Sequence, residues 1–250
     1  TTMSASIAGF YSGAKVCHVE AGLRTNNLLS PFPEEMNRQV TGRVAKYHFA
    51  PTLKSQQNLL KENISKENIL ITGNTVIDAL LESSEKVRIL NNEDVIYLQN
   101  KVNFSKRILL VTGHRRENHG QGFINICDAL KQIAVNNTDL EIIYPVHLNP
   151  NVLKPVNDLL KNIKNIHLIK PLPYPKFVWL MNKSYLIITD SGGVQEEAPS
   201  LGKPVLVMRD TTERPEAVEA GTVILVGTDT NKIITHTQEL LDNSQVYQKM

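Results

Sequence analysis

The sequence of 250 residues is poor in cysteine, carries almost no net charge and has no long apolar run. Its two cysteines, Cys17 and Cys127, are far apart and form no C-x-x-C pair, which argues against a disulfide framework or a zinc site. A net charge of +2 without a block of Lys and Arg argues against a nucleic-acid surface. No apolar run approaches the roughly 20 residues that cross a bilayer. We therefore expect a cytoplasmic protein that binds neither nucleic acid nor membrane.

The composition and the pattern of apolar residues predict an α/β fold. A hydrophobic fraction of 41% with 21% charged residues is typical of globular proteins. Short apolar strands alternate with helical segments, which indicates parallel sheets covered by helices. The expected strands are residues 14–20, 47–50, 69–72, 107–112, 140–146, 165–169, 185–189, 204–208 and 222–226. The expected helices are residues 3–12, 33–45, 54–62, 122–135, 150–161, 176–183, 194–201, 213–220 and 230–242.

The alternation is interrupted between residues 77 and 106, where the sequence is charged and loosely helical without strand signals. We interpret this stretch as a connection between two domains, residues 1–76 and 107–250. The first predicted helix starts almost at Thr1, with no room for a preceding element. We therefore expect the chain to begin inside its first domain.

The segment from Leu186 to Val207 carries the clearest functional pattern. A β-branched strand ends at Asp190-Ser191-Gly192-Gly193, and a short helix containing Glu196 and Glu197 follows. Such a turn places backbone N–H groups at the carboxyl edge of a sheet, where anions bind, and a carboxylate beyond it can bind a ribose diol. Because the glycines do not form G-x-G-x-x-G, a nucleoside diphosphate is favoured over a dinucleotide. A purely structural Gly-Gly turn is the alternative.

Polar residues also follow other predicted strands. The five strand ends carry Glu20, Thr112 to Glu117, His147 to Asn149, Asp190 with Ser191, and Arg209 with Asp210. Ligands of open parallel sheets bind outside the carboxyl ends of the strands. We therefore expect a ligand site at this edge, although one or two of these residues have the alternative role of helix caps.

Several longer motifs extend through essentially the whole chain. They are HVEAGLRT (18–25), SPFPEEMNR (30–38), ITGNTVIDALL (71–81), VTGHRRENHG (111–120), YPVHLNPNV (144–152), FVWLMN (177–182), TDSGGVQEEAPSLGKPVLVMRDTTERPEA (189–217) and GTVILVGTD (221–229). Together they resemble the bacterial, non-hydrolysing UDP-N-acetylglucosamine 2-epimerase family. The resemblance implies two Rossmann-like domains of the glycosyltransferase-B type, with residues 107–250 as the UDP-binding domain. It also implies that the N-terminal domain is incomplete and that the chain is a fragment without a C-terminal tail, inactive alone.

The family's reaction, as the resemblance implies it, converts UDP-N-acetylglucosamine reversibly to UDP-N-acetylmannosamine (UDP-ManNAc). UDP is eliminated to leave 2-acetamidoglucal and is then added back after protonation from the other face. Proton removal and return on opposite faces need two differently placed acid/base groups. The departing diphosphate needs positive charge and N–H donors. The resemblance implies no cofactor and no metal, and a homodimer as the assembly.

The resemblance implies catalytic roles for Glu20, Glu34 and His114. The alternative for Glu20 is an ion pair with Arg24. The alternative for Glu34 is a residue that stabilises the helix dipole, because an acid in the first turn behind proline is common. His114 lies between a glycine and Arg115, which fits a phosphate contact better than a solvated loop histidine.

The UDP contacts that the resemblance implies are Ser191, Gly192, Gly193, Glu197, Arg214 and Phe177. Phe177 would border the uracil through its backbone, and core packing is its alternative role. Leu172 has at most a backbone role. Bacterial members are also activated by their own substrate, at positions that match Glu34, Arg115 and His147; His147 has the alternative of a satisfied histidine at a strand end.

Three other functions stay open. A hydrolysing 2-epimerase would release free N-acetylmannosamine, although VTGHRREN and ERPEA resemble the non-hydrolysing branch. A glycosyltransferase of the same fold would share the donor loop but would not need the carboxylates of HVEAGLR and PFPEE together. A nucleotide-binding module without catalysis is the alternative outside the enzymes.

Overall fold

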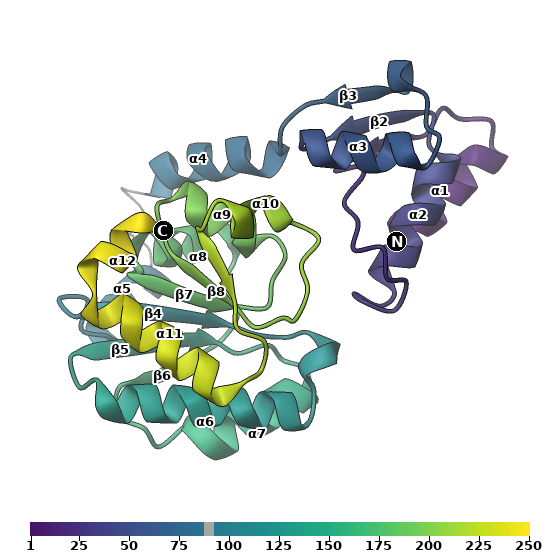
Figure 1. Ribbon diagram of the computed structural model, residues 1–250. Coiled ribbons are helices and arrows are strands. Elements are labelled where there is room, and N and C mark those ends of the chain that lie inside the picture. Colours follow the sequence, from purple (N-terminus) through teal and green to yellow (C-terminus); the bar gives the residue numbers. More distant parts are fainter. Residues whose placement is uncertain (88–92) are drawn as a thin grey trace. The chain divides into compact units, whose positions relative to one another are not determined.

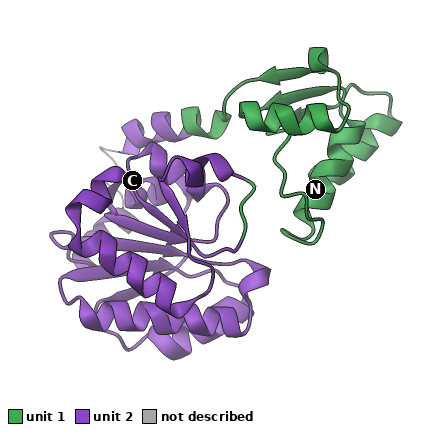
Figure 2. Ribbon diagram, in the orientation of Figure 1, with its two compact units in different colours: residues 1–79, 211–213 green, residues 80–210, 214–250 purple. Residues whose placement is uncertain are grey.

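The computed structural model describes residues 1–87 and 93–250, which divide into two compact units (Figures 1 and 2). The first unit contains residues 1–79 and 211–213, and the second contains residues 80–210 and 214–250. Each unit has its own sheet, and every strand pair within the sheets is parallel. The predicted α/β class is therefore confirmed.

The first unit is built on a three-stranded sheet. Its strands, in spatial order, are β1 (Cys17–Val19), β2 (Tyr47–Ala50) and β3 (Ile69–Ile71). Its helices are α1 (Thr2–Tyr11), α2 (Glu34–Val44) and α3 (Leu53–Lys61), with a short 3-10 turn η1 (Lys66–Asn68). Helices α1 and α2 pack together, and α3 packs against β2 and β3. The core is small, and apolar side chains of the strands, among them Val19 and Leu70, are exposed.

The second unit contains a six-stranded sheet. Its strands are β4 (Arg107–Thr112), β5 (Leu140–Pro145), β6 (Ile166–Ile169), β7 (Leu186–Thr189), β8 (Val205–Val207) and β9 (Val223–Leu225). The spatial order is β6-β5-β4-β7-β8-β9, so β4 lies between β5 and β7. The strand order reverses at β4, and this switch point is where parallel sheets of this kind bind ligands.

Helices cover both faces of the six-stranded sheet, because successive side chains of each strand point to opposite faces. Leu109 and Val111 of β4 face a core that includes α6 (Gln121–Asn136), α7 (Pro150–Leu160) and α11 (Thr230–Asp242). Ile108 and Leu110 face a second core. That core includes α4 (Thr75–Val87), α5 (Glu93–Lys101), α8 (Tyr174–Lys183) and α9 (Val194–Ser200). The remaining α-helices of the described residues are α10 (Pro215–Glu219) and α12 (Ser244–Lys249).

The stretch that we expected to connect two domains, residues 77–106, folds differently. Residues 88–92 lie outside the described part of the chain. The rest contains α4 and α5, whose Leu80, Val87, Val95 and Leu98 are buried in the second unit's core. The division between the units falls after Ala79. Most of this stretch therefore belongs to the second unit, because its apolar residues form a stripe that packs against the sheet.

Candidate active site

Glu20 and Glu34 line the same hollow in the first unit. Glu20 directly follows β1 with a φ angle of 60°, a left-handed conformation that is uncommon for residues other than glycine. Glu34 is the first residue of α2. The hollow has a volume of about 330 Å³, and His18 and Arg38 also line it. The two residues that we predicted to be catalytic therefore line one hollow.

The two adjacent glutamates of the PFPEE motif have different surroundings. Glu35 is fully buried, and its carboxylate accepts hydrogen bonds from the backbone N–H groups of Thr25 and Asn26 at 3.0 and 3.1 Å. It also accepts one from Gln39 Nε2 at 3.0 Å. Glu35 thus fastens the loop after β1 to α2, whereas Glu34 lines the hollow.

Arg24 does not support the alternative of an ion pair with Glu20. Its Nε and Nη2 atoms donate to the two carboxylate oxygens of Glu62 at 2.6 and 3.0 Å, and Nη1 donates to the Leu23 carbonyl at 2.8 Å. Such a two-point pair satisfies both planar groups. The structure therefore pairs Arg24 with Glu62.

His18 is a residue of this hollow for which the sequence suggested no role. Its side chain is buried, and its Nδ1 atom has no hydrogen-bond partner among the described residues. Burial, and to a lesser extent the neighbouring His48, lowers the pKa of His18 from 6.5 to about 4. A neutral imidazole thus lies in the hollow with Glu20 and Glu34. The only sign of this in the sequence was that His18 lies two residues before Glu20 on a predicted strand, where residues two apart point to the same face.

In the second unit, the polar residues after β4 and β7 meet at the switch point. The hydroxyls of Thr112 and Thr189, the last residues of these strands, are 2.6 Å apart. Asp190 is fully buried, and its Oδ2 accepts the backbone N–H groups of His114 and Arg115 at 2.9 and 2.8 Å. The side chain of His114 is 45% exposed. The buried aspartate thus holds a loop that presents His114 to solvent.

Neighbouring side chains leave little space for a side chain at Gly113, which precedes His114. A Cβ atom at this position would lie 3.0 Å from the Tyr144 hydroxyl, and also near Met208 and Phe123. Tyr144 is fully buried and donates its hydroxyl to the Gly113 carbonyl at 3.4 Å. Burial, and secondarily the Asp190 charge, raises the pKa of Tyr144. Tyr144 therefore supports the loop as a neutral donor.

His147 stacks against His114. The ring centroids are 5.6 Å apart and the rings are inclined by 25°. His147 Nδ1 accepts the backbone N–H of Asn149 at 3.1 Å, so its ring is oriented by its own loop. The sequence assigned His114 to catalysis and His147, with Arg115, to activation. The structure stacks the rings of His114 and His147, and Arg115 directly follows His114 in the loop that Asp190 holds.

The predicted diphosphate loop connects β7 to α9. The Ser191 N–H donates to Thr189 Oγ1 at 3.0 Å. Gly193 has a φ angle of −66°, and a Cβ atom there would be 3.7 Å from Glu197 Oε2 at the nearest, an ordinary contact. The fold itself therefore does not require glycine at this position. The predicted diphosphate contact would require glycine here, because a ligand would approach the backbone closely.

Glu197 and Arg214, two further predicted UDP contacts, are each held by a neighbour. Glu197 is 6% exposed and accepts a hydrogen bond of 2.7 Å from the Tyr174 hydroxyl. Burial raises the pKa of Glu197, and the Tyr174 hydrogen bond lowers it in part. Arg214 forms an ion pair with Glu196 at 2.8 Å. Both pairs involve α9, the helix that follows the glycine turn.

Phe177 is half buried and packs against the core of the second unit. Its backbone N–H donates to the Pro173 carbonyl at 3.0 Å. The packing role that we gave as the alternative is thus observed. The uracil contact stays a prediction.

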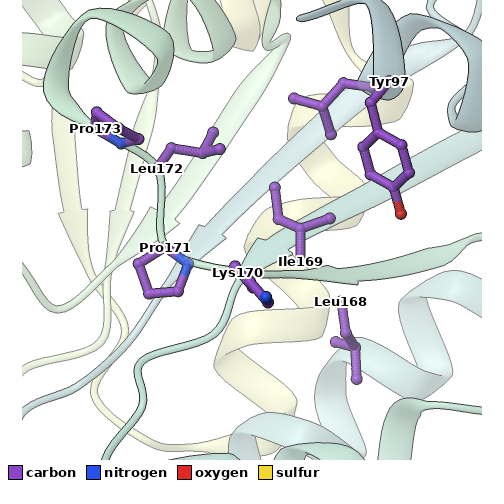
Figure 3. Close-up of a pocket in the computed structure, with 8 residues that line it drawn as sticks. Tyr97, Leu168, Ile169, Lys170, Pro171, Leu172 and Pro173 are labelled. Atoms are coloured by element: carbon purple, nitrogen blue, oxygen red, sulfur yellow. The ribbon is translucent and has the colours of Figure 1, made fainter. Parts of the chain in front are cut away.

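A larger hollow of about 610 Å³ lies at the end of the edge strand β6 (Figure 3). Its lining residues are Tyr97, Leu98 and residues 168–173. Leu172, for which the sequence allowed a backbone contact, belongs to this lining, but none of the predicted catalytic or UDP-binding residues does. We assign no ligand to it.

The described residues contain no group of three or more His, Cys, Asp or Glu side chains that could hold a metal ion. None of the helices in residues 1–87 and 93–250 is long and apolar enough to cross a membrane.

A protein-family model described as UDP-N-acetylglucosamine 2-epimerase matches residues 1–250. The chain belongs to this family. It is 58% identical to a UDP-N-acetylglucosamine 2-epimerase of Campylobacter jejuni and 56% identical to one of Salmonella typhimurium. Each alignment covers 100% of this chain and 67% of the relative. The chain thus spans about two thirds of the length of these curated relatives.

Solved structures show the same likeness. The UDP-GlcNAc 2-epimerase of Neisseria meningitidis, solved with UDP-GlcNAc bound, is 50% identical with a TM-score of 0.93, covering 99% of this chain and 67% of that one. The enzyme of Methanocaldococcus jannaschii, solved with UDP-GlcNAc and UDP, is 35% identical with a TM-score of 0.86, covering 100% and 71%. These neighbours confirm the predicted fold of the glycosyltransferase-B type.

Proposed function

We propose that this protein is a non-hydrolysing UDP-N-acetylglucosamine 2-epimerase, an isomerase that interconverts UDP-GlcNAc and UDP-ManNAc. The observation that carries the proposal is the joint placement of Glu20 and Glu34 in one hollow of the first unit. A glycosyltransferase or a nucleotide-binding module has no need for two carboxylates there. Family membership and relatives solved with UDP-GlcNAc support the same substrate.

In the proposed reaction, the C2–H proton and UDP leave to give 2-acetamidoglucal. A proton then returns to C2 from the other face, and UDP adds back to C1. Glu20 and Glu34 are the acid/base groups for these proton transfers, since two differently placed groups are needed. Their neighbour Glu35 is excluded from this role, because its carboxylate is buried and accepts three hydrogen bonds.

The second unit provides the groups for UDP. The turn of Ser191, Gly192 and Gly193 offers backbone N–H groups to the diphosphate, and the first N–H groups of a helix have no partner within it. Glu197 accepts hydrogen bonds from the ribose diol, and Arg214 provides positive charge. His114 assists departure of the diphosphate as a proton-carrying side chain. Phe177 borders the uracil.

We also propose that Arg115 and His147, with Glu34, take part in activation by the substrate. The supporting observation in the second unit is the stacking of His147 on His114, because a ligand that moves one ring would move the other. We further propose that the enzyme is a cytoplasmic homodimer. Its product, UDP-ManNAc, is used to make cell-envelope polysaccharide.

One experiment separates the possible activities. The full-length protein is incubated with UDP-GlcNAc in deuterated water, and the products are followed by ¹H NMR. Epimerisation gives UDP-ManNAc and deuterium at C2, whereas a hydrolysing epimerase gives free N-acetylmannosamine and UDP. A glycosyltransferase would leave the donor unchanged without an acceptor. Recovery of unaltered UDP-GlcNAc together with tight UDP binding would contradict the proposal and favour a binding module.

A further inference from the structure

The two carboxylate oxygens of Asp190 have different surroundings. Oδ2 accepts three donors of the loop after β4: the backbone N–H groups of His114 and Arg115 at 2.9 and 2.8 Å, and Asn118 Nδ2 at 3.3 Å. Asn118 belongs to a short 3-10 turn, η2 (Arg116–Asn118), and also donates to the Met208 carbonyl at 3.2 Å. One oxygen of Asp190 therefore fixes the backbone of the loop.

The other oxygen, Oδ1, faces the imidazole of His114. The distance from Oδ1 to His114 Nδ1 is 3.3 Å. Oδ1 is buried and accepts no hydrogen bond from the described residues in this conformation. A buried carboxylate oxygen without a partner is rare and needs an explanation. Hydrogen bonds among catalytic groups are often long without a ligand and shorten in the complex.

We propose that Asp190 is the positioning residue of His114. Its Oδ1 accepts the Nδ1–H proton and thereby fixes the tautomer in which Nε2 is left to hold or deliver a proton to the departing diphosphate. His147 packs on the ring and limits its rotation. The inference rests on the proposed function of His114, but the tautomer itself is a property of the protein alone.

The substitution Asp190→Asn tests this assignment because an amide has only one acceptor atom. The three donors at the Oδ2 position require the amide oxygen there. The NH₂ group must then take the Oδ1 position and donate to His114 Nδ1, so that the neutral ring carries its proton on Nε2. In other enzymes such a change keeps the geometry of a histidine but inverts its tautomer.

The measurement is a long-range ¹H–¹⁵N correlation spectrum of the full-length protein with labelled histidine, recorded at a pH where the ring is neutral. The His114 signals are assigned from their loss in His114→Gln. We expect Nδ1–H in the unsubstituted protein and Nε2–H in Asp190→Asn. Turnover should fall by about 100-fold or more, the scale of general acid–base catalysis, while the dissociation constant for UDP changes much less.

Asn118→Ala is the matched control, because it removes a donor to Oδ2 and leaves Oδ1 unchanged. It should retain the Nδ1–H tautomer even where it lowers the melting temperature of the protein. An Nε2–H tautomer in the unsubstituted protein, or no switch in folded Asp190→Asn, would overturn the proposal. A tautomer switch in a protein without epimerase activity would uphold the role of Asp190 and contradict the proposed function, so the two failures are distinguishable.

Discussion

The Tyr174 hydroxyl donates a hydrogen bond of 2.7 Å to Glu197, the carboxylate that we propose for the ribose of UDP. Burial raises the pKa of Glu197, and this hydrogen bond acts in the opposite direction. Burial and the adjacent carboxylate in turn raise the pKa of Tyr174, so the phenol stays a donor at neutral pH. Tyr174 thus favours the ionised form of a carboxyl group whose neutral form burial favours.

Replacing Tyr174 by phenylalanine should therefore change the pH dependence of UDP binding. Without the hydroxyl, the pKa of Glu197 rises further. As the pH is lowered, UDP affinity should therefore start to fall at a higher pH than it does in the unsubstituted protein. At neutral pH we expect affinity to fall about 10-fold, the scale of one hydrogen bond to a charged group. Calorimetric titrations with UDP between pH 5 and 8 measure both effects. In the control Glu197→Gln, UDP affinity should be low and should no longer depend on pH in this way. If Tyr174→Phe and the unsubstituted protein show the same pH dependence of UDP affinity, Tyr174 has no role in UDP binding.

Substitution of Gly193 should separate folding from UDP binding. Its φ angle of −66° and the nearest contact of 3.7 Å for an added Cβ indicate that the fold accepts a side chain there. A ligand lying on the turn would not accept it, because the side chain would occupy the space of the phosphate oxygens. We expect Gly193→Val to keep its melting temperature and lose measurable UDP binding.

Ser200→Ala, at the exposed end of the same helix, is the control for Gly193→Val and should bind UDP normally. Undiminished UDP binding by a folded Gly193→Val protein would make the turn purely structural.

The sequence predicted that polar residues at the strand ends lie at one edge of the sheet, but not the contacts among them. Regular alternation of strands and helices brings all carboxyl ends to one edge, so Asp190 and His114 were both expected there. Their contact depends on β4 pairing with β7, strands far apart in the chain. Such pairing is a long-range property that local patterns do not encode.

Without the family resemblance, the residue pattern could not distinguish the roles of Glu34 and Glu35. Both are acids in the first turn of the same helix. Which of the two residues faces the loop after β1 depends on how α2 is positioned in the folded unit. The structure shows it through the three hydrogen bonds that Glu35 accepts.

The different surroundings of Glu34 and Glu35 predict different effects for isosteric substitutions of Glu20, Glu34 and Glu35. In the full-length enzyme, Glu20→Gln and Glu34→Gln should each lower turnover by about 100-fold or more with little change in UDP affinity, since a missing acid/base group acts on the chemical step. Glu35→Gln should instead destabilise the fold by about 1–3 kcal/mol, because an amide cannot accept all three hydrogen bonds. Turnover of UDP-GlcNAc and urea unfolding are measured for each variant. Normal epimerisation by Glu20→Gln would exclude that residue from the mechanism.

The buried His18 predicts that the protein loses stability in mild acid. Its pKa is about 4 in the folded state and 6.5 as the ordinary value, so between these values the unfolded chain binds more protons. The contribution is fully present above pH 6.5 and is lost as the pH falls from 6.5 towards 4. A difference of this size corresponds to about 3 kcal/mol at most.

We expect His18→Asn to reduce this pH dependence, as measured by urea unfolding at pH 7.5, 6 and 5. The exposed His147, replaced by glutamine, is the control and should leave the profile unchanged. His48 is buried beside His18 and its pKa is also lowered, mainly by burial, so part of the acid sensitivity should remain in His18→Asn. An unfolding free energy that is constant from pH 7.5 to 5 in the unsubstituted protein would show that His18 is not held neutral by burial.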